Sequence, residues 1–123
     1  HKLGRKSAII TGRSSRVVER RAKELGITYL YQDVKDKKAV LHAILEKEGL
    51  GFDNVAAIGD DLNDLSLLEA VKLSFAPHDA MPLVQSKVDV ILSRDGGRGA
   101  VREMIESVIK REGLEKEFIN LWL

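Results

Sequence analysis

Short apolar runs alternate along the chain with longer segments in which apolar residues recur at helical spacing. A repeated order of strand and helix is typical of parallel sheets, so the pattern predicts an α/β fold with a Rossmann-like parallel sheet and helices on both faces. The expected strands are residues 7–10, 27–31, 55–58, 73–76 and 88–92, and the expected helices are residues 17–25, 37–48, 62–71 and 99–111. Residues 77–87 should add one or two helical turns. Because the chain has no linker or repeat, residues 1–123 are expected to form a single domain.

The composition argues against several classes of function. Twenty basic and nineteen acidic residues leave a formal net charge of +1 with the signs interspersed, which does not favour a nucleic-acid or membrane-surface binder. The chain has no cysteine, so it can form neither a disulfide framework nor a thiolate metal site. No apolar run approaches the roughly 20 residues of a membrane span. We therefore expect a cytoplasmic protein without nucleic-acid or membrane partners.

Three aspartates, Asp60, Asp61 and Asp64, follow the third expected strand directly after Gly59. In open α/β folds the ligand crevice lies at the carboxyl edge of the sheet, and clustered carboxylates there suit a hard cation such as Mg²⁺. A single aspartate could instead cap the following helix. Three of them would repel one another at close range, which calls for a cation or a lysine nearby. We expect Asp60 to hold the metal.

Two further polar positions are expected at the same edge. Thr11 follows the first strand, and its hydroxyl together with the backbone N–H of Gly12 suits a phosphate oxygen. Lys37, near the start of the second helix, can neutralise another oxygen. Each has an ordinary alternative, because a Thr-Gly pair after a strand is usually turn chemistry and Lys37 lies between Lys35 and Lys38 in what could be a solvated face. The order of all three positions nevertheless favours a phosphate site.

These positions resemble motifs two, three and four of the haloacid dehalogenase superfamily of phosphohydrolases. The matching residues are Ile9-Ile10-Thr11-Gly12-Arg13, Lys37 and Gly59-Asp60-Asp61-Leu62-Asn63-Asp64. A later stretch, Asp95-Gly96-Gly97-Arg98-Gly99-Ala100-Val101-Arg102-Glu103, is similar to the 3-deoxy-D-manno-octulosonate 8-phosphate phosphatases, a capless branch of that superfamily. The resemblance implies a phosphatase domain that uses Mg²⁺ and acts on a small-molecule sugar-acid phosphate. Phosphates of nine-carbon sugar acids are the alternative substrates.

The resemblance also implies roles for individual residues. Thr11 would bind the phosphoryl group, Lys37 would stabilise its charge, and Asp64 would orient Lys37 or a metal-bound water. Asp60 would ligate Mg²⁺, with Asp61 as a candidate for the outer sphere.

The substrate-binding residues implied by the resemblance are Gly12, Arg13 and Arg98. A guanidinium suits bidentate recognition of planar anions such as the carboxylate of a sugar acid. The ordinary alternatives are surface solvation for Arg13 and a flexible helix entry for the glycines around Arg98.

One element of the superfamily pattern is absent from the chain. The first motif is an apolar strand followed by Asp-x-Asp, whose first aspartate is the nucleophile and whose second is the general acid/base. No such motif precedes Ser7, and the chain opens on His1 without an initiator methionine. We expect a longer protein to supply the motif, so that this chain alone is inactive. The alternatives are a non-catalytic oligomerisation module, like those appended to sugar-acid cytidylyltransferases, and a phosphate-binding regulator.

The end of the chain is unusually apolar. Its apolar residues are Phe118, Ile119, Leu121, Trp122 and Leu123. A lone subunit would expose them, so we expect a homo-oligomer, and the resemblance implies a tetramer. The alternative is that this segment folds back onto its own sheet.

Overall fold

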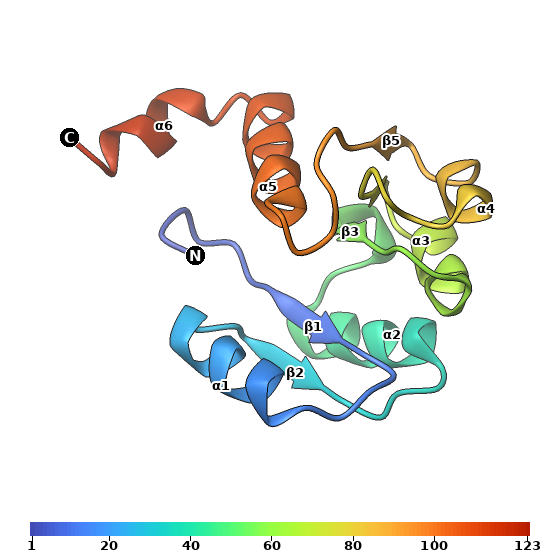
Figure 1. Cartoon of the computed structure of the whole chain (residues 1–123). Helices are drawn as coiled ribbons and strands as arrows, with labels where there is room; N and C mark the ends of the chain where they lie inside the picture. The colour runs from blue at the N-terminus through green and yellow to red at the C-terminus, as the bar shows by residue number, and fades with distance from the viewer.

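Strands and helices alternate along the chain as the sequence predicts. The structure is a computed structural model that describes residues 1–123 (Figure 1). The strands are β1 (Ala8–Ile10), β2 (Tyr29–Tyr31), β3 (Ala56–Ile58), β4 (Leu73–Ala76) and β5 (Val90–Ile91). The α-helices are α1 (Arg16–Leu25), α2 (Lys37–Glu48), α3 (Leu65–Ala70), α4 (Pro82–Gln85), α5 (Ala100–Arg111) and α6 (Glu115–Asn120), with 3₁₀ helices η1 (Phe52–Asn54) and η2 (Leu62–Asp64). The α/β prediction is confirmed.

Residues 62–71 differ from the single expected helix. The first turn, η2, is a 3₁₀ helix, and α3 begins only at Leu65. The carboxylate of Asp61 accepts a hydrogen bond from the backbone N–H of Leu62 at 2.7 Å. A 3₁₀ turn is common at the start of a helix, and here it lies beside the aspartates that were expected to form the site.

All of the strand pairs are parallel, but they form two sheets. Strand β1 pairs with β2, and β4 lies between β3 and β5 in a second sheet. Figure 1 shows the two groups, with α1 and α2 beside the first sheet and α3 to α5 around the second. Neither β1 nor β3 pairs with a strand on its second edge. Each of these strands therefore keeps backbone groups free to form hydrogen bonds with a further strand.

Helix α2 joins the two sheets. It is preceded by Asp36, whose side chain accepts a hydrogen bond from the backbone N–H of Ala39, and followed by Gly49, which is left-handed with φ of 68°. Asp36 is thus an N-cap and Gly49 a C-cap, which explains why the expected bounds are observed. The buried core beside α2 consists of Leu41, Leu45, Leu67 and Val71, and Ile10 of β1 and Ala57 of β3 pack against it.

Strand β4 is the centre of the second sheet. Phe75 and Ala76 are fully buried. Phe75 packs with Leu92 and Ala100, which ties the start of α5 to β4. The carboxyl ends of β3, β4 and β5 are thus held at one edge of the sheet. None of the helices combines the length and the apolar character needed to cross a membrane.

The sequence pattern does not predict the last helix, α6, which contains Phe118 and Ile119 of the apolar chain end. Helix α6 packs against α5. Ile119 is 55% exposed, and Trp122 and Leu123 are 70% and 96% exposed. The alternative that this segment folds back onto its own sheet is therefore wrong.

Candidate active site

The loops after β1 and β3 meet at the carboxyl edge of the strands. Thr11 directly follows β1, and Gly59 and Asp60 directly follow β3. A Cβ atom added to Gly12 would lie 3.5 Å from the side-chain nitrogen of Asn63. The structure thus places the expected phosphate loop against the expected acidic loop, although the two are about fifty residues apart in the sequence.

Lys37 and Asp64 form an ion pair at this edge. The Nζ atom of Lys37 lies 2.6 Å from Oδ1 of Asp64, and the two side chains are only 8% and 14% exposed. The other oxygen, Oδ2 of Asp64, accepts hydrogen bonds from the backbone N–H groups of Asp60 at 3.0 Å and Asp61 at 3.2 Å. Asp64 therefore holds Lys37 and shapes the acidic loop. The alternative of a solvated face is wrong for Lys37.

The Asp64 side chain leaves no room for a side chain at residue 59, so this position requires glycine. A Cβ atom added to Gly59 would lie 2.6 Å from Cβ and 2.8 Å from Cγ of Asp64. Real Cβ atoms do not approach other carbon atoms this closely, so any larger residue would displace Asp64 from Lys37.

We predict that Gly59→Ala lowers the free energy of unfolding by about 1–3 kcal/mol, because the added methyl group overpacks a filled position. Gly51→Ala is the matched control, since no atom lies within 4 Å of the Cβ that it would add. Chemical denaturation of both variants measures the difference. Equal stability of the two variants would show that the loop can move aside.

The Thr11 loop presents free donors for an anion. The backbone N–H of Thr11 donates to Tyr31 at 3.0 Å, and its carbonyl accepts from Val34 at 3.0 Å, so the loop is tied to the segment after β2. Its Oγ1 accepts a hydrogen bond from the backbone N–H of Arg13 at 3.2 Å, which leaves the hydroxyl proton free to donate. The N–H of Gly12 has no acceptor within the chain. Arg13 is exposed and forms no ion pair.

Asp60 and Asp61 have different surroundings. Asp61 caps η2, so the capping alternative holds for this residue. The carboxylate of Asp60 is exposed and accepts no hydrogen bond, while its backbone carbonyl accepts one from Met81 at 3.0 Å. A free carboxylate at this edge fits one ligand position of Mg²⁺. The chain contains no group of three or more His, Cys, Asp or Glu residues that could hold a metal ion.

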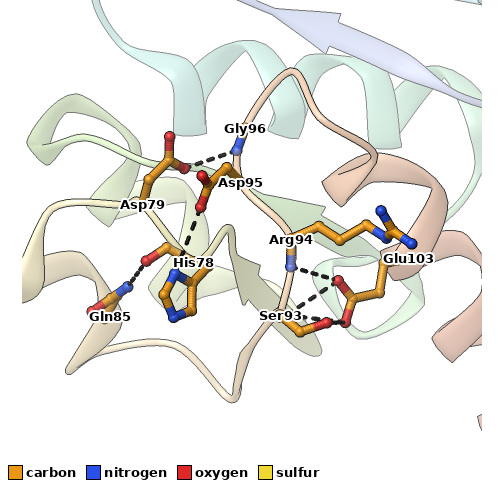
Figure 2. A network of polar contacts seen from close by, with 8 residues as sticks. All are labelled: His78, Asp79, Gln85, Ser93, Arg94, Asp95, Gly96 and Glu103. Carbon is orange, nitrogen blue, oxygen red and sulfur yellow. Dashed lines mark hydrogen bonds and ion pairs between the residues drawn. The ribbon is translucent and has the colours of Figure 1, made fainter.

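Arg98 lies in the loop of residues 92–99 between β5 and α5, the Arg98 loop. The backbone N–H of Arg98 donates to the carbonyl of Asp95 at 3.0 Å. The backbone N–H of Gly96 donates to the carboxylate of Asp79 at 2.8 Å, as Figure 2 shows. These contacts argue against a flexible helix entry. Arg98 itself is exposed and forms no ion pair.

The sequence pattern predicts no role for Glu103, which organises the start of the Arg98 loop. Its carboxylate accepts hydrogen bonds from the backbone N–H groups of Ser93 and Arg94 and from the hydroxyl of Ser93. The N–H of Ser93 is the main cause that holds the pKa of Glu103 below its ordinary value, opposed by partial desolvation. The available signal was an acidic residue in the first turn of a helix.

A hydroxyl, a free backbone N–H, a buried lysine and a free carboxylate meet at the carboxyl edge of parallel strands. An α/β protein with this arrangement at its strand ends is suited to binding a phosphate group. Residues 29–105 match the family described as haloacid dehalogenase-like hydrolase, and the chain belongs to that family. The resemblance inferred from the motifs is thereby confirmed.

Individual relatives are named phosphatases. The chain is 44% identical over 106 residues to 3-deoxy-D-manno-octulosonate 8-phosphate phosphatase KdsC from Escherichia coli (strain K12). The aligned residues make up 86% of this chain and 56% of the relative. The chain thus spans about half the length of the curated relatives that it matches.

Solved structures of such phosphatases share the fold. The enzyme from Moraxella catarrhalis, in complex with magnesium ion, phosphate ion and KDO, superposes with a TM-score of 0.93 at 37% identity, covering 99% of this chain and 70% of that one. The cobalt-bound enzyme from Haemophilus influenzae superposes with a TM-score of 0.86 at 33% identity, covering 91% and 66%.

Proposed function

We propose that the complete protein is a Mg²⁺-dependent phosphatase of sugar-acid phosphates, with 3-deoxy-D-manno-octulosonate 8-phosphate as the substrate. The observation that carries this proposal is the buried pair of Lys37 and Asp64 beside the free donors of Thr11 and Gly12. A buried ammonium at this edge is suited to the negative charge of a phosphoryl group. The named relatives support the choice of substrate.

The residues of the candidate site would have different tasks in this reaction. Thr11 and Gly12 would donate hydrogen bonds to phosphoryl oxygens, and Lys37, oriented by Asp64, would offset the charge that develops on them. Asp60 would hold Mg²⁺, which supplies positive charge beside the phosphate, and Asp61 would stay in the outer sphere. Arg13 and Arg98 would bind the carboxylate or hydroxyls of the sugar acid.

The nucleophile would come from a segment outside this chain. We propose that an aspartate carried on an extended segment attacks phosphorus while the P–O bond to the sugar breaks, and that a second aspartate of that segment protonates the leaving sugar oxygen. Water then hydrolyses the acyl phosphate, which frees the aspartate and releases inorganic phosphate. The free edges of β1 and β3 support this idea, because a parallel strand placed between them would complete one continuous sheet. The carboxyl end of that strand would then lie between Thr11 and Asp60.

Assembly and location belong to the same proposal. We propose one phosphatase domain, assembled as a homotetramer in the cytoplasm. The exposed side chains of Ile119, Trp122 and Leu123 support self-association, and the cysteine-free sequence fits a reducing compartment. Light scattering of the complete protein measures its mass.

The test is release of inorganic phosphate by the complete protein. We expect release from 3-deoxy-D-manno-octulosonate 8-phosphate with Mg²⁺ and its loss with a chelator, while the 123-residue chain alone is inactive. The phosphate of a nine-carbon sugar acid is the competing substrate. Binding of phosphate without turnover would support a regulator, and neither binding nor turnover would support the oligomerisation module.

A further inference from the structure

Glu103, in the first turn of α5, holds the strand end that leads into the Arg98 loop. Its two carboxylate oxygens lie 3.1 and 3.0 Å from the backbone nitrogen of Ser93, and one of them lies 2.9 Å from the backbone nitrogen of Arg94. The hydroxyl of Ser93 donates to the same carboxylate at 2.9 Å (Figure 2). A carboxylate that accepts several N–H and O–H groups forms stronger hydrogen bonds than a neutral acceptor would. The loop is thus fastened to a helix that is itself packed on β4.

The Arg98 loop is fastened on its other side to the segment after β4. Gly96 donates to Asp79, and the backbone N–H of His78 donates to the carbonyl of Arg94 at 2.9 Å. Two residues after Asp79, the N–H of Met81 donates to the carbonyl of Asp60. The segment of residues 78–81 therefore forms hydrogen bonds both with the acidic loop at Asp60 and with the Arg98 loop at Arg94 and Gly96. Glu103 holds the other side of the Arg98 loop.

The geometry of Gly99 leaves this loop little freedom. Gly99 is left-handed with φ of 98°, and a Cβ atom added there would lie 2.9 Å from Cδ of Arg94. The side chain of Arg94 thus fills the space beside Gly99, between the two ends of the loop. Releasing Glu103 would therefore loosen the loop at Ser93 and Arg94, the end that Glu103 holds, while α5 stays packed.

We propose that Glu103 is a positioning residue for substrate recognition, which holds Arg98 in place to bind the carboxylate of the sugar acid. This inference rests on the proposed function. Glu103 does not touch the reacting atoms, so its effect should be larger for substrates that carry the carboxylate than for a simple phosphate ester.

The experiment compares Glu103→Gln with Glu106→Gln in the complete protein. The first change keeps the size of the side chain but removes its charge and one acceptor oxygen, and the second does the same on the exposed face of α5, where Glu106 pairs with Arg102. Kinetics are measured with 3-deoxy-D-manno-octulosonate 8-phosphate and with p-nitrophenyl phosphate. For Glu103→Gln we expect KM for the sugar-acid phosphate to rise at least tenfold, with kcat changed much less. The ratio of kcat/KM for the two substrates should fall by a similar factor, whereas Glu106→Gln should leave this ratio unchanged.

A second comparison isolates Arg98. In an Arg98→Ala background, Glu103→Gln should cost little further affinity for the sugar-acid phosphate, because the group that it positions is already absent. Amide hydrogen exchange of Ser93 and Arg94 should be at least tenfold faster in Glu103→Gln than in Glu106→Gln.

Two kinds of failure are distinguishable. If the wild-type protein releases no phosphate from any sugar-acid phosphate, the proposed function is wrong and this inference falls with it. If the wild-type protein is active but Glu103→Gln lowers kcat/KM equally for both substrates, Glu103 only supports the fold and the inference alone is overturned. Unchanged exchange at Ser93 and Arg94 would overturn it as well.

Discussion

Lys37→Ala in the complete protein is expected to lower turnover by about 10²–10³-fold, the usual cost of removing one donor that stabilises transition-state charge. The structure places the Lys37 ammonium against Asp64, and nothing else in the chain supplies a buried positive charge there. Steady-state kinetics with a saturating sugar-acid phosphate measures the loss as a change in kcat.

Lys38→Ala is the matched control, because Lys38 is the next residue on α2 and is exposed. It should change kcat by less than about twofold, as surface substitutions usually do. Lys37→Ala also leaves the Asp64 carboxylate without its counter-ion, which can cost about 3–5 kcal/mol of folding free energy. Circular dichroism and denaturation therefore accompany the kinetics. Similar small losses of kcat in the two folded variants would remove Lys37 from the site.

Asp60→Asn is expected to lower Mg²⁺-dependent turnover by about 10³-fold or more, since a neutral amide does not supply the charge that a hard cation requires. The fold should be unaffected, because the Asp60 carboxylate is exposed and accepts no hydrogen bond. We expect the free energy of unfolding to change by less than about 0.5 kcal/mol. Calorimetric titration with Mg²⁺ gives a second readout, in which the variant should bind far more weakly than the wild type.

The control for Asp60→Asn is Asp53→Asn, which removes the same charge from an exposed position in η1. Its activity and Mg²⁺ affinity should equal those of the wild type. Full activity of Asp60→Asn would exclude Asp60 as a metal ligand. An equal loss in both variants would point to a general effect of net charge.

Local patterns in the sequence account for much of the fold. Helix α2 has the expected bounds because Asp36 and Gly49 cap its two ends, and those signals act over only a few residues. Strand β4 also has the expected bounds, because a short apolar run is flanked by Lys72 and Pro77. The placement of Thr11 and Asp60 at the carboxyl ends of their strands follows from the local pattern of a strand followed by a helix.

Contacts between distant residues could not be derived in this way. The division into two sheets depends on which strand edges find a partner, and the chain's own strands leave the facing edges of β1 and β3 unpaired. The different surroundings of Asp60 and Asp61 depend on which hydrogen bonds the η2 turn can form. The role of Glu103 depends on a strand end ten residues away, brought to α5 by the packing of β4.

The sequence by itself determined the α/β class, the helix caps and the strand ends that Thr11 and Asp60 follow, because these depend on spacing and residue type within short segments. Only the tertiary structure decided that Asp64 holds Lys37 in a nearly buried pair and that Glu103 fastens the Arg98 loop. It also decided that, of the three aspartates after β3, Asp60 is the one whose carboxylate forms no hydrogen bond. The physical reason is that a hydrogen bond or ion pair depends on distance and angle, and between elements far apart in the chain these are set by packing.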